Sequence, residues 1–312
     1  MNNKILVFSE NLGNACEMLA GAKGLGGDCI AVHIGGEADA KTLIAHGASK
    51  AYYFEKEDGI AFEAYADDIA ALAAKEAPGL MMVGMTNRGR TVAAIVAQAL
   101  QAPCASECKS IEKNGDGKYV ISRKVFGGKA TSTEVCQADT LVVTVPMRSY
   151  EPLAEDKAAK GETVKLSRSG DCGVKFISEA AKGGDSVDIT AASTLVLFGR
   201  GVEKAEDMAM MEELAGLLGG VTACTRPLAV DYGWMPTSRY VGLSGKSVKP
   251  ALYLDIGSSG QIQQIAGASD AKIIVAINNK ESEPVFKVCD YGVVADLYEA
   301  VPALIGLLKK LH

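Results

Sequence analysis

The residues best suited to chemistry follow short apolar runs in the last third of the sequence. Gly199-Arg200-Gly201 comes directly after one such run, and Gly257-Ser258-Ser259-Gly260 comes after another and opens a helical pattern. Backbone N–H groups at a turn of this kind can bind a pyrophosphate, and a nearby arginine adds positive charge. Taken singly, Arg200 is equally well explained as a surface charge and Ser259 as a helix cap. Their occurrence together at strand ends favours a phosphate-binding site.

Familiar catalytic motifs do not occur in the sequence. Gly245-Lys246-Ser247 resembles the end of a phosphate-binding loop, but Tyr240 stands where that motif needs its first glycine. No Gly-x-Gly-x-x-Gly follows the first strand pattern, which argues against an ordinary NAD-binding site. The 3 histidines lie far apart, and Cys104 and Cys108 have no second pair to complete a metal site. We therefore expect binding chemistry, with no catalytic residue and no metal.

The candidate phosphate site needs a sheet to hold it, and residues 191–312 have the pattern of one. Strands are predicted at 195–198, 252–256, 273–277 and 291–294, and helices at 203–218, 260–267 and 297–311. Alternating strands and helices indicate a doubly wound parallel sheet, and ligands of such sheets bind at the carboxyl ends of the strands.

Residues 1–150 predict a second α/β domain. Strands are expected at 5–8, 30–34, 51–54 and 80–83, with helical patterns between them, so this sheet should also be parallel. The loop at 84–90 is best read as a turn in which Thr86 or Asn87 caps the next helix, with anion binding as the alternative.

The pattern changes after residue 102. Short β-type segments between 103 and 149 are separated by Asn114-Gly115 and Asp116-Gly117, which are hairpin signals. They predict antiparallel strands that extend the edge of the first sheet. Residues 151–190 are polar and read as a connecting segment with a short strand at 174–177.

Composition excludes several classes of protein. The chain has 312 residues, a formal net charge of -6 and 6% aromatic residues, which argues against nucleic-acid binding. Its 8 cysteines are scattered, as expected for free thiols in a reducing compartment. The N-terminus has no signal or transit pattern, and no apolar run reaches the roughly 20 residues that a bilayer requires. We expect a cytoplasmic protein without membrane insertion.

Several segments together resemble the α (large) subunit of electron transfer flavoproteins, a FixB-like family. The resemblance is carried by residues 199–201, 225–226, 241–246, 257–264, 276–278 and 290–297. Their order and spacing match the family's C-terminal FAD domain, and residues 4–149 resemble its N-terminal domain more loosely. The resemblance implies that residues 1–150 contact a partner subunit and that residues 191–312 bind FAD.

The resemblance also implies a role for each matching residue. The residues that would hold the pyrophosphate and the ribityl chain are Arg200, Ser259, Gly260, Gln261, Ile262, Gln263 and Gln264. The residues that would hold the adenosine half are Asn278, Asp296 and Leu297. Implied around the isoalloxazine ring are Thr225, Arg226, Val241, Gly242, Leu243 and Ser244, with Arg226 against the ring and the Ser244 hydroxyl at N5.

Four positions depart from the family pattern. Ser244 replaces the usual threonine and keeps a hydroxyl, while Thr225 and Pro227 replace serine and alanine. Gln264 replaces the usual histidine. A glutamine can still donate a hydrogen bond to flavin O2 but carries no positive charge, which affects the flavin potential.

The implied function is that of an electron carrier without catalytic activity of its own. The family forms a heterodimer with a β subunit and exchanges electrons with acyl-CoA dehydrogenases, a membrane quinone oxidoreductase or, in bifurcating versions, NADH and ferredoxin. The sequence does not choose among these partners. Two alternatives stay open, an adenine-nucleotide-binding module without a redox role and a pyridine-nucleotide dehydrogenase.

Overall fold

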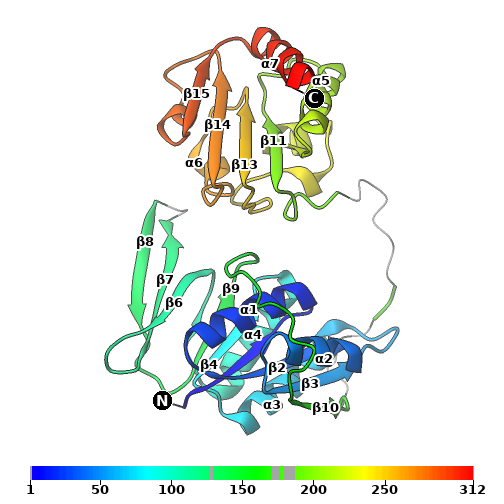
Figure 1. The fold of residues 1–312 in the computed structure, drawn as a ribbon, viewed down its shortest axis with the longest axis vertical. Coiled ribbons are helices and arrows are strands. Elements are labelled where there is room, and N and C mark those ends of the chain that lie inside the picture. Colours follow the sequence, from blue (N-terminus) through cyan, green and yellow to red (C-terminus); the bar gives the residue numbers. More distant parts are fainter. Residues whose placement is uncertain (1, 127–128, 171–173, 175, 179–186, 312) are drawn as a thin grey trace. The chain divides into compact units, whose positions relative to one another are not determined.

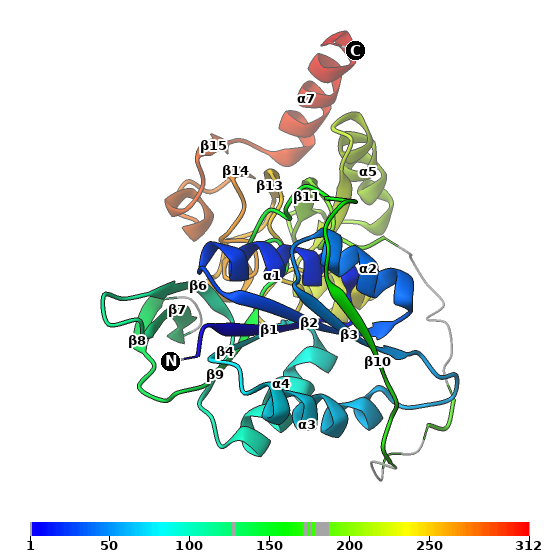
Figure 2. The same cartoon turned by 60° about the horizontal axis from the view of Figure 1, so that its bottom comes forward.

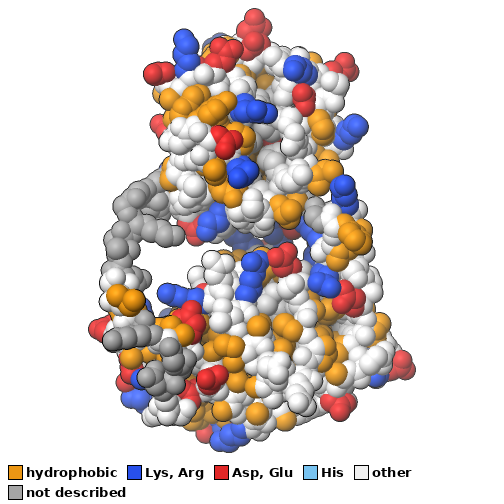
Figure 3. Space-filling model, turned by 180° about the vertical axis from the view of Figure 1, so that it is seen from behind, with side chains coloured by type: hydrophobic (Ala, Val, Ile, Leu, Met, Phe, Trp, Pro, Cys, Tyr) orange, Lys and Arg blue, Asp and Glu red, His pale blue; other side chains and the backbone are white. Residues whose placement is uncertain are grey.

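The computed structural model describes residues 2–126, 129–170, 174, 176–178 and 187–311. The chain divides into two compact units, unit 1 (Met1–Ala180) and unit 2 (Ala181–His312), and each is an α/β fold (Figure 1). None of the described helices is long and apolar enough to cross a membrane. On the face shown in Figure 3, basic and acidic side chains are interspersed, so this face presents no continuous basic surface.

Unit 1 alternates strands and helices before it changes to short strands. Its elements are β1 (Lys4–Phe8), α1 (Leu12–Gly24), β2 (Asp28–Gly35), α2 (Glu37–Ala45), β3 (Lys50–Glu55), η1 (Phe62–Tyr65), α3 (Ala66–Glu76), β4 (Leu80–Gly84), α4 (Asn87–Leu100), β5 (Cys104–Ala105), β6 (Cys108–Lys113), β7 (Tyr119–Val125), β8 (Ala130–Val135), β9 (Leu141–Val145) and β10 (Glu162–Leu166). Seven of the strands form one parallel sheet in the order β10-β3-β2-β1-β4-β9-β5. The expected parallel α/β class is confirmed.

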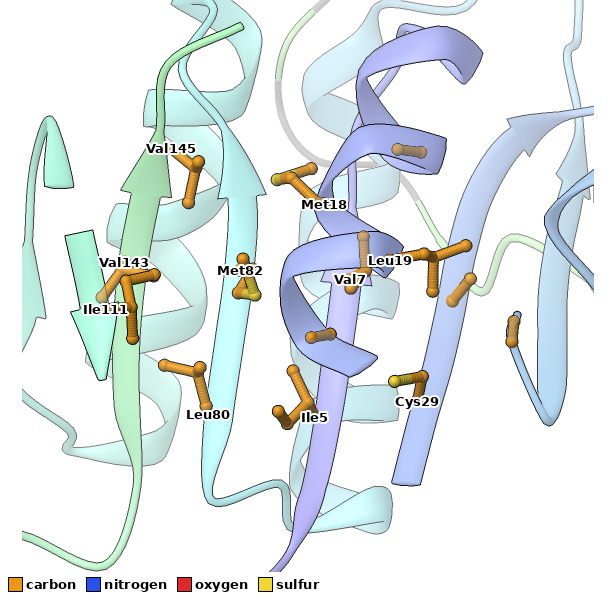
Figure 4. Close-up of a cluster of buried hydrophobic side chains, with 14 of the residues drawn as sticks. Ile5, Val7, Met18, Leu19, Cys29, Leu80, Met82, Ile111, Val143 and Val145 are labelled. Atoms are coloured by element: carbon orange, nitrogen blue, oxygen red, sulfur yellow. The ribbon is translucent and has the colours of Figure 1, made fainter. Parts of the chain in front are cut away.

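Helices cover both faces of this sheet. Figure 2 shows α1 and α2 on one face and α3 and α4 on the other. On the first face, Met18 and Leu19 of α1 lie over Val7 of β1 and Met82 of β4 in one buried cluster (Figure 4). Because both faces are buried, the central strands are continuous apolar runs instead of alternating ones.

The antiparallel strands do not extend the edge of this sheet as expected. Strands β6, β7 and β8 form a separate three-stranded sheet, paired antiparallel. The next strand, β9, returns to the main sheet and pairs in parallel with β4 and β5. Its sequence, Leu-Val-Val-Thr-Val, is buried throughout, whereas β8 is largely exposed. A strand buried on both faces suits a central position in a parallel sheet and not a hairpin.

Part of the expected connecting segment at 151–190 also belongs to a sheet. Strand β10 pairs in parallel with β3 from Glu162 to Leu166 and so becomes the edge of the main sheet. In the predicted strand at 174–177, Val174, Phe176 and Ile177 have no regular secondary structure, and Lys175 lies outside the described residues.

Unit 2 is a smaller doubly wound unit. Its elements are β11 (Thr194–Phe198), η3 (Ala205–Asp207), α5 (Met208–Leu217), β12 (Val221–Cys224), η4 (Pro227–Asp231), η5 (Thr237–Arg239), β13 (Leu252–Ile256), α6 (Ile262–Ile265), β14 (Ile273–Asn278), η6 (Pro284–Lys287), β15 (Tyr291–Val294) and α7 (Leu297–Leu311). The five strands pair in parallel in the order β12-β11-β13-β14-β15. Strand β12 was not predicted, because its four residues follow directly on the helix-ending Gly219-Gly220.

The two faces of the unit 2 sheet are covered differently. Helices α5 and α7 pack on one face through Met211, Leu214, Val301 and Ile305, and Lys309 pairs with Glu213 between them at 2.5 Å. The other face buries Leu195, Leu197 and Tyr253 beneath residues of the 241–248 segment and of the turn that follows α6. The short helix α6 lies on that side, and it spans Ile262–Ile265 where a helix over 260–267 was predicted.

Candidate functional site

The candidate site lies at the carboxyl edge of the unit 2 sheet, where the strand order reverses. Strand β12 pairs with one side of β11. The chain then crosses back, and β13 pairs with the other side of β11. The chain after β11 leads to α5 on one face of the sheet and the chain after β13 leads to α6 on the other face. Open α/β sheets bind ligands at such a point.

Glycines let these two loops approach each other closely. A Cβ atom added at Gly199 would lie 2.7 Å from the Gly257 carbonyl oxygen, and one at Gly201 would lie 2.7 Å from the Gly257 Cα. The Gly201 N–H donates to the Gly257 carbonyl at 2.9 Å. A larger residue at either position would separate the loops, so these glycines shape the floor of the site.

A cleft of about 810 Å³ opens above this floor, a volume typical of small-molecule sites. The cleft brings together most residues expected from the sequence, namely Arg200, Thr225, Arg226, Val241, Gly242, Leu243, Ser244, Ser259, Gln261, Gln263, Gln264, Asn278, Asp296 and Leu297. Gly260 and Ile262 do not line it. Gly260 has a φ of +68, and a Cβ atom added there would lie 2.5 Å from the Val285 Cα. The side chain of Ile262 is half exposed.

Several polar atoms in the cleft have unused hydrogen-bonding capacity. Among the described residues, the Thr225 hydroxyl and the Oε1 atom of Gln264 are enclosed and have no hydrogen-bond partner, whereas the equally enclosed Ser258 hydroxyl acts on the Asp255 carboxyl group. Enclosed polar atoms without partners are rare in native proteins and are a sign of a missing ligand or water. Arg200 and Arg226 line the same cleft and are exposed. The lining therefore suits a polar, anionic ligand.

Asn278 and Asp296 also hold the site together. The Asn278 side-chain amide donates to the Ser258 carbonyl at 2.7 Å, and its Oδ1 accepts from the Lys280 N–H at 2.9 Å. The Asp296 carboxylate accepts from the Tyr298 N–H at 2.8 Å at the start of α7. Asn278 thus connects the end of β14 to the loop after β13, and Asp296 caps the start of α7.

The segment from Val241 to Ser244 forms a tight loop. The Gly242 N–H donates to the Lys246 carbonyl at 3.2 Å, and the Leu243 N–H donates to the Gln263 carbonyl at 2.7 Å. The backbone of Gly242, with φ +152, lies against that of Gln263. This anchoring leaves the side chains of Leu243 and Ser244 exposed at the cleft.

Gln264 is oriented differently from what its sequence position led us to expect. Its Nε2 donates to the Asp255 Oδ2 at 2.7 Å and to the Tyr253 hydroxyl at 2.9 Å. Both amide hydrogens are directed into the protein, so Oε1, a hydrogen-bond acceptor, is the unpartnered atom. Burial raises the pKa of Asp255 to about 6, against the lowering effect of the Ser258 and Gln264 side chains.

Some cleft residues were missed as site residues from the sequence. They are Glu203, Pro227, Tyr240, Asn279, Lys280, Glu283 and Tyr298. Gly201, Gly257 and Ser258 also line the cleft, and they belong to the two turns from which a phosphate-binding site was predicted. Most of the missed residues adjoin an expected residue, so the strand-end segments themselves were the available signal. Tyr298 joins the site through its hydroxyl, which accepts from the Glu203 N–H at 2.9 Å and donates to the Asp207 carboxylate at 2.6 Å. It connects α7 to the loop after β11.

The loop at 84–90 in unit 1 has the geometry of a helix cap. The Thr86 hydroxyl accepts from the Gly89 N–H at 2.9 Å at the start of α4. Arg90 pairs with Glu107 at 2.8 Å. The capped-turn interpretation is thus borne out for Thr86. Of the two arginines in this loop, Arg90 is engaged by a carboxylate and Arg88 lies over the Phe62 ring.

Comparisons with known proteins identify relatives along the whole chain. The model of the electron transfer flavoprotein domain matches residues 4–170, and that of the electron transfer flavoprotein FAD-binding domain matches residues 188–269. The chain is 32% identical over 310 residues to the putative electron transfer flavoprotein subunit YdiR of Escherichia coli K12, covering 99% of each chain. It is 32% identical over 311 residues to the protein FixB of Escherichia coli O127:H6, again covering 99% of each.

Proposed function

Since the chain belongs to the electron transfer flavoprotein family, as an α-type subunit, we propose that it binds FAD in the unit 2 cleft and carries electrons between other flavoproteins. The observation that carries this proposal is the cleft itself. It combines a glycine floor, two exposed arginines and enclosed hydroxyl and amide oxygens without partners. This donor and acceptor set fits a large, polar dinucleotide better than a compact apolar ligand.

The proposed division of the cleft follows the position of its residues. Arg200 and the 258–261 turn at the end of β13 would hold the pyrophosphate, where backbone N–H groups meet a cation. Asn278, Asp296 and Leu297, at the ends of β14 and β15, would hold the adenosine half. The 241–244 loop, Arg226 and Gln264 would surround the isoalloxazine ring.

FAD would supply the ability to accept and release electrons, while this chain binds the cofactor and sets its electrostatic surroundings. Arg226 follows β12 and precedes η4, with its side chain exposed at the cleft. A guanidinium stays charged at all working pH values and stacks on planar rings. At about 4 Å and an effective dielectric near 20, it would stabilise a negative charge on the ring by at most about 4 kcal/mol.

The proposed partners are a β subunit, forming a heterodimer, and flavoprotein dehydrogenases of the acyl-CoA dehydrogenase type. Unit 1 would carry the partner-subunit interface. In this proposal the chain is a carrier and not an enzyme, and the chemistry on substrates belongs to the dehydrogenases. A downstream acceptor or a bifurcating complex would complete the transfer. The described cysteines are free, which suits the proposed cytoplasmic location.

The test is an absorption titration of the chain co-purified with its candidate β subunit. FAD is added to the complex, free cofactor is removed, and the visible spectrum is followed during stepwise anaerobic reduction. A bound flavin that is reduced and reoxidised reversibly supports the carrier function. A complex that binds AMP or ADP but stays colourless after FAD is added would support an adenine-nucleotide-binding module and overturn the proposal.

A further inference from the structure

A buried carboxylate lies at the end of β13, and the proposed function does not use it. Asp255 is 1% exposed and lies two residues before Gly257, the glycine that contacts the loop after β11. Its side chain alternates to the same face of the sheet as Tyr253, the face covered by α6 and the 241–248 segment. A charge in this position is costly to bury unless hydrogen bonds compensate it.

Two side chains act on the Asp255 carboxyl group, Ser258 and Gln264, and the amide of Gln264 also reaches the cleft lining. Nε2 of Gln264 lies 2.7 Å from the Asp255 Oδ2 and 2.9 Å from the Tyr253 hydroxyl. The opposite atom of the same amide, Oε1, is enclosed without a partner, and Gln264 lines the cleft. One side chain thus connects the buried carboxylate to the ligand site.

The protonation state of Asp255 decides which way this amide can face. An ionised carboxylate only accepts hydrogen bonds, so the amide nitrogen must face it, because two acceptor oxygens at this separation would repel each other. A protonated carboxyl group can instead donate to Oε1, and the Tyr253 hydroxyl can donate to the same oxygen. The amide can then turn over and direct its two N–H groups toward the cleft.

We propose that Asp255 is a positioning residue that sets the hydrogen-bonding character of Gln264 toward the ligand. With Asp255 ionised, Gln264 presents an acceptor, Oε1; with Asp255 protonated, it presents a donor, Nε2. The inference rests on the proposed function only for the identity of the ligand, a flavin whose ring lies against Gln264. It adds a residue whose effect on the flavin is exerted through another side chain.

Both states of Asp255 are accessible near neutral pH, since burial raises its pKa to about 6. The neighbouring strands contribute apolar residues opposite it, Leu197 of β11 and Ala276 of β14. The titratable groups coupled to Asp255 are Tyr253 and Cys289, and burial raises the pKa of both. Both groups are therefore neutral in the pH range where Asp255 titrates, and Asp255 is the group that switches.

This arrangement links flavin reduction to proton uptake by the protein. Reduction adds negative charge to the flavin ring, which favours N–H donors facing the ring and disfavours an acceptor oxygen. The electrons come from the reducing partner, and a solvent proton binds to the Asp255 carboxylate. No covalent bond between heavy atoms of the protein is made or broken. The midpoint potential should therefore have an inflection near the pKa of Asp255.

A first experiment tests the amide without any flavin. The side-chain NH₂ resonances of Gln264 are followed by ¹⁵N NMR in the full chain between pH 5 and 8. We expect a titration with a midpoint near the Asp255 pKa, and its loss in Asp255→Asn, which keeps the shape of the side chain but not the charge. The matched control is Glu212→Gln, an exposed carboxylate on α5, which should titrate as the parent does. Resonances that titrate equally in Asp255→Asn would overturn the inference.

A second experiment measures the consequence for the cofactor. Midpoint potentials of the FAD-loaded complex are determined over the same pH range for the parent, Glu212→Gln, Asp255→Asn, Gln264→Leu and the double variant. The inflection should be lost in Asp255→Asn, and Asp255→Asn should cause no further shift in the Gln264→Leu background. A full-sized Asp255→Asn shift in that background would show that Asp255 acts directly and would overturn the role of Gln264. If no variant binds FAD, the proposed function fails, while the NMR titration still decides the inference.

Discussion

The two units contain the same kind of parallel sheet, yet their carboxyl edges are finished differently. In unit 1 several polar groups at this edge are paired within the protein. The His33 ring Nδ1 lies 2.8 Å from the Ser9 carbonyl, and the Glu107 N–H donates to the Thr144 hydroxyl at 2.9 Å. In unit 2 the Thr225 hydroxyl and the Gln264 Oε1 are enclosed without partners, and both residues line a cleft of about 810 Å³.

Unpaired oxygens alone do not account for the difference. Glu10 and Asn14, near the end of β1, also have enclosed oxygens without partners among the described residues. There, however, a Cβ at Gly84 would lie 2.4 Å from the Asn14 Oδ1, so the loops pack directly against each other. In unit 2 the loops after β11 and β13 contact each other at Gly199, Gly201 and Gly257, and the cleft opens beside these contacts. The same fold therefore supports either a closed structural edge or an open binding edge, depending on the loops.

The largest expected effect tests the loop support of the open edge. Gly260→Val should destabilise unit 2 by about 4 kcal/mol or more and abolish FAD binding, because φ +68 and the Val285 backbone at 2.5 Å leave no room for a side chain. The measurement is thermal unfolding together with FAD content. Gly306→Ala on α7 is the control, since a Cβ there meets nothing within 4 Å. A stable, yellow Gly260→Val protein would contradict the role assigned to this turn.

A second prediction concerns the stability cost of the open edge. The pKa of Asp255 in the folded chain, about 6, lies above its ordinary value of 3.8. The folded state therefore binds the proton more tightly than the unfolded state, and the stability that this contributes is lost as pH rises through about 6. Asp255→Asn should stabilise the apo chain by up to about 3 kcal/mol at pH 8 and by almost nothing near pH 4. Denaturant unfolding at the two pH values measures this. A gain of equal size at both would exclude titration of Asp255 as its cause.

The third prediction compares an arginine from each edge. Arg200→Ala should weaken FAD binding about 10- to 100-fold, the value of one or two charge-assisted hydrogen bonds. Arg90→Ala should leave the affinity unchanged, because Arg90 is paired with Glu107 in unit 1. Fluorescence titration with FAD provides both dissociation constants. Equal losses in the two variants would mean that the edges do not differ in the way proposed.

The smallest expected effect tests the closed edge. Thr86→Ala removes the hydroxyl that accepts from the Gly89 N–H at 2.9 Å and should cost about 1 kcal/mol of stability. Thr86→Ser keeps the cap and should restore most of that loss. FAD content should be the same in both variants. A Thr86→Ala protein that lost its flavin while it stayed folded would point to a ligand role for this loop.

The sequence by itself determined the alternation of strands and helices and the positions of the strand-end turns. Apolar runs that end in small or polar residues, such as Gly199-Arg200-Gly201, are local signals of strands and their loops. The turns at 199–201 and 257–260 were located in this way. The other expected site residues, and the binding roles of all of them, follow from the family resemblance.

Tertiary structure decided which strands pair and how the polar groups orient. Strand β9 joined the parallel sheet, β10 became its edge, and β12 was added to unit 2, because pairing partners far apart in sequence leave no local periodicity. The Gln264 amide nitrogen faces Asp255 and Tyr253, which are nine and eleven residues away along the chain but adjacent in space. The direction of a hydrogen bond depends on which partners folding brings together, and residue type alone cannot supply it.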